Sequence, residues 1–592
     1  MDYRWDLSVL YDGIDTEKYH TDAKQLSEFV SKLVSLSEKT GKIADNELID
    51  GYLRINEQLT LTEARLFSYL NLRFATNSDD LEAKSQFGKI ISVANEAAEP
   101  EAVIEAYIGK IENLDELIAE NEFFAQYAYL LKNLKRDAKY LLKGGEENIL
   151  AKTDVYSGQA WSDLQTTLTS SLKIPFNDKI LTLSDIRNLA YDKDENVRKA
   201  AYEAELKAYD NIKESVAFCL NSIKMQAITE AELRGYSSVE DKTLKNSRVK
   251  KETLDALLKA IEKSLPAFRR YFKKKAQILG DKNGLPWYDL FAPVSCGEEG
   301  QTFTPESARD YLVKVFSPVD KELADMIEEA FDNRWIDFYP RAGKTGGAFC
   351  MELLEQKQSR VLTNFGGKFT DVMTLAHELG HAYHNLNLYF NPPLATSYSM
   401  PVAETASNFN EVIVMDYALK NAKSKAEKLA LLEGKLSDTA QIICDIYSRY
   451  LFEKSVIEHR KEVFNNADGF AEEMIKAQKS SYGDGLDENF LHPYMWICKS
   501  HYYSAFLSFY NWPYAFGGLF AQGLFAEYVK RGQGFIPDYK KMLKNTPVCD
   551  AEEVAKIAGV DLTDEKFWDE GLAYFENLIE EFCSLSDELF NL

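Results

Sequence analysis

The chain has 592 residues, with a hydrophobic content of 45% and a charged content of 28%, as in an ordinary soluble globular protein. This length is too great for one compact core, so we expect two or more lobes. The net charge of −25 argues against nucleic acid as a partner, because an acidic surface repels a phosphate backbone.

The N-terminus and the cysteines both indicate a cytoplasmic location. The first residues carry neither a basic segment nor an apolar one, so we predict no signal peptide. An odd number of cysteines without any CxxC pair argues against a disulfide framework and against a cysteine-ligated metal. A reducing compartment fits both features. The seven cysteines are Cys219, Cys296, Cys350, Cys444, Cys498, Cys549 and Cys583.

Helical patterns dominate the chain, so the predicted fold class is mainly α. Residues 196–206 are rich in good helix formers, and Thr304 followed by Pro305 is typical of a helix start. The Pro, Asn and Asp content of residues 175–194 indicates a boundary. We therefore divide the sequence into an N-terminal helical lobe, residues 1–185, and a second region, residues 186–592.

A short stretch in the middle of the chain has the pattern of a small sheet. Residues 359–365 alternate in the manner of a strand and are closed by Gly366-Gly367. A looser region, residues 339–348, comes before them. Such interruptions of a helical protein often carry its chemistry. We expect residues 359–364 to form an edge strand, which can bind a substrate backbone by strand addition.

The strongest motif is His377-Glu378-Leu379-Gly380-His381. The chain has only seven histidines, so a chance HExxH match is expected about once in a hundred such sequences. Thr370 or Asp371 can cap a helix that runs to the prolines at 392–393. On that helix His377 and His381 share the face opposite to an apolar stripe, and His384 joins them there.

Two imidazoles four residues apart on one helix face can bind one metal ion. Glu378 lies one step round the helix from His377, where it can reach a metal-bound water without binding the metal. A metzincin needs Gly at position 384 and His at position 387, which are His384 and Asn387, so that class is excluded.

A downstream carboxylate can complete the site. Glu404 is the first acidic residue after His381, and Pro401 suits the first turn of a helix that contains it. Glu411 lies seven residues further on the same expected face. Glu404 can therefore bind the metal while Glu411 orients a ligand histidine.

Residues 501–516 are unusually rich in aromatic side chains. The stretch from Tyr502 to Ala526 contains no charged residue and is long enough to cross a bilayer, but Asn511, Pro513, Gln522 and a glycine pair favour the buried wall of a cleft. Tyrosine and histidine need partners for their polar atoms. One of them can stabilise an oxyanion at the metal site.

These motifs resemble the thimet oligopeptidase and oligoendopeptidase F family of zinc peptidases, and the oligoendopeptidase F branch most closely. The resemblance covers most of the chain. Its matching pieces are Trp5-Asp6-Leu7, residues 160–164, 285–290, 343–348, 363–365 and 374–382, Glu404-Thr405-Ala406-Ser407, His501-Tyr502-Tyr503, and residues 509–510 and 514–517. The tyrosine-rich segment, residues 501–516, departs from the glycine-rich form of the thimet branch at Asn511-Trp512-Pro513.

The resemblance implies a zincin-type metallopeptidase, with two helical lobes around a deep substrate channel and a small β-sheet near the zinc site. It implies one zinc ion per chain, endopeptidase action on short peptides, and residues 186–592 as the catalytic region. By motif position, the zinc ligands are His377, His381 and Glu404, and Glu378 is the general base. The implied transition-state stabilisers are His501 and Tyr510, with Tyr514 as a third.

Two alternatives remain open at the level of the sequence. A carboxypeptidase or dipeptidyl carboxypeptidase on the same scaffold needs a cation for the substrate's terminal carboxylate, and Arg341 or Lys344 can supply one. A non-catalytic peptide-binding protein is the other alternative. The presence of Glu378 argues against it, because binding alone needs no general base.

Overall fold

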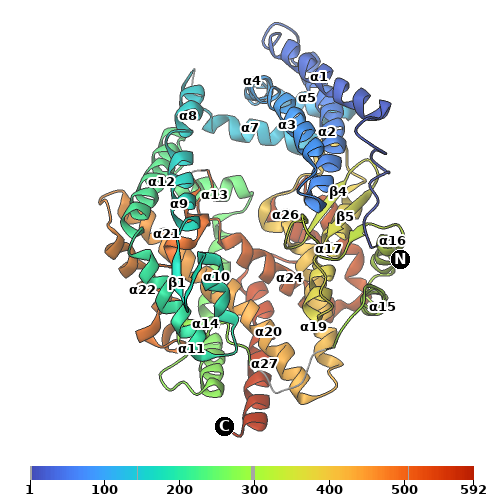
Figure 1. Cartoon of the computed structure of the whole chain (residues 1–592). Coiled ribbons are helices and arrows are strands. Elements are labelled where there is room, and N and C mark those ends of the chain that lie inside the picture. The colour runs from blue at the N-terminus through green and yellow to red at the C-terminus, as the bar shows by residue number, and fades with distance from the viewer. Residues whose placement is uncertain (1–2, 143–144, 295–300, 505) are drawn as a thin grey trace. The chain divides into compact units, whose positions relative to one another are not determined.

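The computed structural model describes residues 3–142, 145–294, 301–504 and 506–592. Helices dominate these residues, which confirms the predicted fold class, and their strands form two small sheets (Figure 1). The chain folds into two compact units of three segments each. The predicted division after residue 185 stays a prediction. Unit 1 contains Met1–Leu141, Gly300–Val414 and Glu527–Gly559; unit 2 contains Leu142–Glu299, Met415–Ala526 and Val560–Leu592.

The first helices of unit 1 pack around an apolar core. Thr16 caps α1 (Glu17–Ser37) by accepting a hydrogen bond from the backbone N–H of Tyr19. This helix packs against α2 (Asp45–Thr76), and the leucines between them, such as Leu26 and Leu53, are fully buried. The other helices of this part are α3 (Leu81–Asn95), α4 (Ala98–Ile108), α5 (Leu114–Glu120), α6 (Glu122–Gln126) and α7 (Ala128–Asp137).

A three-stranded sheet follows in unit 1, in the order β3-β5-β4. β5 (Gln358–Leu362) pairs in parallel with β3 (Ile336–Asp337) and antiparallel with β4 (Phe349–Leu353). The predicted strand is therefore present, but the expectation that it forms an edge is wrong. Its backbone groups are used on both sides, and among the described residues β3 and β4 are the edge strands of this sheet.

The remaining helices of unit 1 come from its second and third segments. α15 (Pro305–Phe316) begins as predicted, because Thr304 accepts the backbone N–H of Ser307 at 3.2 Å. α17 (Phe369–Leu388) packs against β4 and β5 (Figure 1). The others are α16 (Lys321–Asp332), α18 (Met400–Ala403), α19 (Thr405–Lys420), which ends in unit 2, α25 (Ile536–Asn545) and α26 (Ala551–Ile557).

Unit 2 is helical apart from a hairpin of β1 (Ile174–Phe176) and β2 (Lys179–Leu181). The helix predicted at residues 196–206 is present as α11 (Glu195–Tyr209). Trp496, Tyr502 and Tyr503 are fully buried in an apolar core of this unit. Its other helices include α8 (Glu146–Asp154), α9 (Gly158–Ser170), α10 (Leu183–Asn188), α12 (Lys213–Arg234), α13 (Val239–Ser247), α14 (Lys251–Leu279), α20 (Lys425–Ala440), α21 (Ile446–Arg460), α22 (Ala467–Tyr482), α23 (Met495–Cys498) and α27 (Glu565–Phe590).

The uncharged stretch after residue 502 enters α24 (Trp512–Arg531), most of whose first fourteen residues are buried. In the described part of the chain, no helix combines the length and apolar character needed to cross a bilayer. Six of the seven cysteines lie in this part, and none of them forms a disulfide. Cys296 lies outside the described residues.

Candidate active site

The helix α17 carries the HExxH motif. Its start is capped by Asp371, whose carboxylate accepts the backbone N–H groups of Lys368 at 2.8 Å and Gly366 at 3.1 Å. The predicted apolar stripe is buried, which fixes the rotation of the helix about its axis. His377 and His381 lie on the other face and are partly exposed.

Three donor atoms meet on this face. Nε2 of His377 lies 3.2 Å from Oε2 of Glu404, and Nε2 of His381 lies 3.3 Å from the same oxygen. One donor atom from each of the three residues lies within 4.8 Å of the others. Ligands at about 2.0–2.2 Å around a tetrahedral zinc lie about 3.3–3.5 Å from one another. The group therefore fits a zinc ion without rearrangement.

The other ring nitrogen of His377 is also held. Its Nδ1 lies 2.7 Å from Oε1 of Glu411, the contact that the sequence predicts. Because a carboxylate only accepts, Nδ1 carries the proton, so Nε2 is the nitrogen that offers a lone pair to a metal when the ring is neutral. Burial lowers the pKa of His377, but hydrogen bonds to Glu404 and Glu411 outweigh it and raise the pKa to about 10. The surroundings of His377 thus favour a positive charge at this position.

Glu378 lies beside this group and is 6% exposed. Burial raises its pKa, while the nearby imidazoles of His377 and His381 oppose the shift. A carboxylate with a raised pKa is a better proton acceptor near neutral pH than an exposed one.

Glu404 reaches the histidines from a break between two helices. The sequence predicted one helix through Pro401, Glu404 and Glu411. Instead α18 ends at Ala403 and α19 begins at Thr405, with Glu404 between them at φ −91° and ψ 10°. That prediction is wrong, although both carboxylates do reach His377.

Two residues that sequence reasoning missed bring α19 to α17. A Cβ on Gly380 would lie 2.6 Å from the Cα of Ser407 and 2.7 Å from the carbonyl oxygen of Ala406, so only glycine permits this approach. The amide of Asn410 donates to the backbone oxygen of Ala376 at 3.1 Å. A glycine inside a helical pattern signals such close packing.

The third histidine of the cluster has another role. His384 is fully buried, and its Nε2 lies 2.8 Å from Oγ1 of Thr546. Its ring stacks on Tyr398 with centroids 4.4 Å apart. Burial lowers the pKa of His384 to about 3, with a further contribution from His381. The ring is therefore neutral and belongs to the core.

A second group of acidic residues also gathers donor atoms, in unit 2. It consists of Glu195, Asp281 and Asp289. Asp289 is already paired with the buried Arg198 at 2.6 Å, and the group contains no histidine. The donor set of a catalytic zinc is therefore found in the first group and not in this one.

The predicted transition-state stabilisers lie together in unit 2. The ring centroid of His501 is 4.7 Å from that of Tyr510 and 5.9 Å from that of Tyr514, and the two tyrosine rings are 5.8 Å apart. Nδ1 of His501 lies 3.0 Å from Oδ1 of Asn511. The structure thus brings these three residues of unit 2 into one group.

The backbone before Tyr510 is strained. Phe509 has a φ of +55°, a conformation that costs a bulky residue roughly 1–3 kcal/mol. Its backbone N–H donates to Glu453 at 2.9 Å, and Glu453 is held in turn by Lys224 at 2.6 Å in a fully buried ion pair. Such strain persists where surrounding contacts impose it, and it often marks a functional segment.

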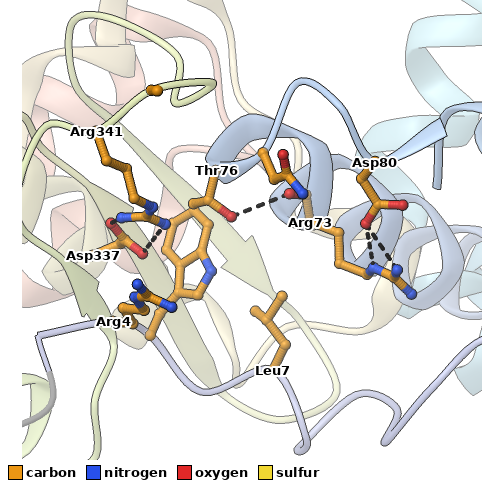
Figure 2. Close-up of a pocket in the computed structure, with 10 residues that line it drawn as sticks. Arg4, Leu7, Arg73, Thr76, Asp80, Asp337 and Arg341 are labelled. Atoms are coloured by element: carbon orange, nitrogen blue, oxygen red, sulfur yellow. Dashed lines mark hydrogen bonds and ion pairs between the residues drawn. The ribbon is translucent and has the colours of Figure 1, made fainter. Parts of the chain in front are cut away.

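The candidate anchors for a substrate carboxylate are already paired. A pocket of about 510 Å³ in unit 1 is lined by charged side chains (Figure 2). There Arg341 forms two hydrogen bonds with Asp337, at 2.7 and 2.9 Å. The side chain of Lys344 is fully buried and also binds Asp337, at 2.7 Å. Arg73, on the other side of the pocket, binds Asp80 at 2.8 Å.

Known proteins resemble this chain over nearly its whole length. Oligopeptidase PepF of Bacillus subtilis is 25% identical and covers 93% of this chain and 83% of its own length. An oligoendopeptidase F homolog of Lactococcus lactis is 26% identical, with 99% and 97% covered. Among solved structures, oligoendopeptidase-F of Enterococcus faecium superimposes with a TM-score of 0.71 at 19% identity, with 97% of this chain and 99% of that chain covered.

Family models match both parts of the sequence. The oligopeptidase F model matches residues 110–174, and the model of peptidase family M3 matches residues 188–574. The second match spans more than half of the chain and includes every residue of the two groups described above. The chain therefore belongs to peptidase family M3.

Proposed function

We propose that the chain is a zinc-dependent endopeptidase that cleaves short peptides, with one zinc ion per chain. Its ligands are His377, His381 and Glu404. The spacing of their donor atoms carries this proposal, because it suits tetrahedral zinc. Membership in peptidase family M3 supports peptides as substrates.

Glu378 is the general base of this reaction. A zinc ion bound here would polarise the scissile carbonyl and lower the pKa of a water beside it. Glu378 takes the proton of the attacking water on its carboxylate and later passes it to the leaving amine. Its raised pKa suits it to both transfers. Glu411 keeps His377 in the tautomer that presents Nε2.

The group in unit 2 serves the same reaction. His501, Tyr510 and Tyr514 contact the substrate at the carbonyl under attack, and a hydroxyl among them donates to the developing oxyanion. Losing one such donor typically costs about 2.7–4 kcal/mol of barrier. The strained backbone at Phe509 supports a functional role for this segment.

The outer edge of β4, an edge strand of the sheet, binds the substrate backbone. An added strand pairs through main-chain hydrogen bonds, so its recognition depends little on side-chain identity. The contact of β4 with α17 supports this role, since α17 carries the zinc ligands. We therefore expect the enzyme to cleave short peptides of many different sequences.

No observation favours the two alternatives. A carboxypeptidase needs a cation for the terminal carboxylate, and both Arg341 and Lys344 are engaged by Asp337. A binding protein has no use for the buried Glu378 beside three metal ligands. A cytoplasmic location and the lack of nucleic-acid and membrane partners belong to the same proposal. The net charge of −25 supports the lack of a nucleic-acid partner.

The decisive experiment is cleavage of an internally quenched peptide that is blocked at both ends. We expect cleavage within the peptide, its loss with a chelator, and its recovery with zinc. Glu378→Gln serves as the matched control, because it removes the base and leaves the three ligands. It should keep one zinc per chain and lose turnover by about a hundredfold or more. Cleavage only of peptides with a free C-terminus would establish the carboxypeptidase instead.

A further inference from the structure

Asn511 occupies a position between a histidine and an arginine in unit 2. It is 1% exposed, and its Oδ1 lies 3.0 Å from Nδ1 of His501 and 3.3 Å from Nη1 of Arg449. One side-chain oxygen thus faces two nitrogen atoms from different parts of the chain.

The arginine decides which atom of Asn511 faces the histidine. A guanidinium group only donates hydrogen bonds, so the atom beside Arg449 is the carbonyl oxygen and not the amide nitrogen. The same oxygen faces His501, whose Nδ1 must therefore carry a proton in order to donate to it. In the neutral ring, Nε2 then carries only a lone pair.

Arg449 is itself fixed in place. It lies one turn after a π-helical segment, Gln441–Asp445, and Asp445 binds its Nη2. The side chains of Arg449 and Asp445 are 12% and 6% exposed. Segments of π-helix are frequent at functional sites, and this one presents the arginine to Asn511.

The charges around His501 favour the neutral ring. Burial lowers its pKa, and the cations Arg449 and Lys499 lower it further. The hydrogen bond to Asn511 and the carboxylate of Glu453 act in the opposite direction but do not outweigh them. The titratable and charged groups that face His501 are Arg449, Glu453, Lys499, Tyr510 and Tyr514.

We propose that Asn511 is a positioning residue that fixes His501 as the Nδ1–H tautomer, so that Nε2 accepts a hydrogen bond from a substrate N–H. Donation to the oxyanion then falls to Tyr510, whose ring lies closest to that of His501. This inference rests on the proposed function. It changes the role that family resemblance implies for His501, from donor to acceptor.

Nitrogen NMR of the zinc-loaded full chain tests the tautomer without any reference to activity. The protein is labelled with ¹⁵N-histidine, and His501→Gln identifies the signal among the seven histidines. We expect a neutral ring protonated at Nδ1 in the wild type. A ring protonated at Nε2, or a doubly protonated ring at neutral pH, would overturn the proposal.

Two substitutions at Asn511 test the consequence for turnover. Asn511→Leu removes the acceptor at similar volume, so the tautomer should become mixed and kcat should fall about tenfold with little change in KM. Asn511→Asp keeps an acceptor and adds negative charge, so it should rescue the tautomer and raise the pKa of His501. Because the neutral ring is the active form, the acidic limb of kcat/KM should then move to higher pH.

A higher turnover of Asn511→Asp at neutral pH would mean that the charged ring is active, and would overturn the proposal. Asn221→Leu is the matched control, since Asn221 is also buried in unit 2 and hydrogen-bonded to backbone carbonyls. It should lower stability without moving the pH profile. If Tyr510→Phe leaves kcat unchanged, or no peptide is cleaved at all, the proposed function fails while the NMR result on the tautomer still stands.

Discussion

His377 in unit 1 and His501 in unit 2 are each held at Nδ1 by another side chain, which leaves Nε2 as the nitrogen with the lone pair in the neutral form of either ring. Their surroundings differ in charge. Two carboxylates flank His377 and raise its pKa to about 10 against the effect of burial. Burial and two cations lower the pKa of His501. The same tautomer is therefore available at both histidines. The negative surroundings of His377 suit a metal cation, whereas the positive surroundings of His501 suit an uncharged partner.

This difference teaches that the partner of Nδ1 sets the tautomer, whereas the wider charge distribution sets the proton affinity. Glu411 performs both tasks for His377, because a carboxylate accepts a hydrogen bond and also carries charge. Asn511 performs only the first task for His501. The sequence motifs identify both histidines, but only the contacts distinguish these two situations.

The largest expected effect comes from the same substitution made in both places. His377→Gln should lose zinc and lower kcat/KM at least about a thousandfold, because the metal supplies several kcal/mol of stabilisation. His501→Gln should keep zinc and lower kcat/KM roughly 10- to 100-fold, through one lost hydrogen bond. Metal analysis and steady-state kinetics of both variants check this. Full zinc occupancy in His377→Gln would show that His377 is not a zinc ligand and that the two histidines do not differ in this way.

His384 extends the comparison to a histidine that has no charged partner. Its pKa is lowered to about 3, mainly by burial, whereas an unfolded histidine titrates near its ordinary value of about 6.5. The unfolded chain therefore binds the extra proton first, and stability falls as the pH falls below about 6.5. Between pH 6 and pH 4 this residue should cost about 1.4 kcal/mol per pH unit.

The variant His384→Gln isolates this contribution. Glutamine can still hydrogen-bond Thr546 but does not titrate, so the variant should lose less stability than the wild type as the pH falls. Thermal unfolding of the metal-free proteins between pH 7 and pH 4 measures the difference. Parallel curves for the two proteins would show that His384 is not a buried neutral ring.

The sequence allowed the mainly helical fold and the grouping of the two histidines with Glu404 to be predicted, because spacing on a helix is a local property. It did not reveal the break at Glu404 or the central place of β5, since both depend on pairing with distant segments. The close approach at Gly380 had a visible signal, a glycine in a helix. Its partner Ser407 could not be inferred without the fold.

The variant Glu411→Gln makes the partner of His377 resemble the partner of His501. The amide oxygen still accepts the Nδ1 proton, but the negative charge is gone, so zinc affinity should fall about 10- to 100-fold. Competition with a zinc chelator measures the affinity. Asp416→Asn is a matched control on the same helix, where the carboxylate pairs with Lys420 at 2.7 Å. An equal loss in both variants would point to net charge rather than to the contact with His377.

The smallest expected effect concerns the hydroxyl that orients the third ligand. Ser407 donates to Oε2 of Glu404 at 2.7 Å, the same oxygen that lies beside both histidines. Ser407→Ala removes one hydrogen bond worth about 1 kcal/mol and adds no volume at the close approach to Gly380, so zinc affinity should fall about fivefold. Thr405→Ala removes a buried hydroxyl that binds only the carbonyl of Val402, and it should leave zinc affinity unchanged. If both variants bind zinc equally, Glu404 is held by the helix break alone and the hydroxyl does not set its direction.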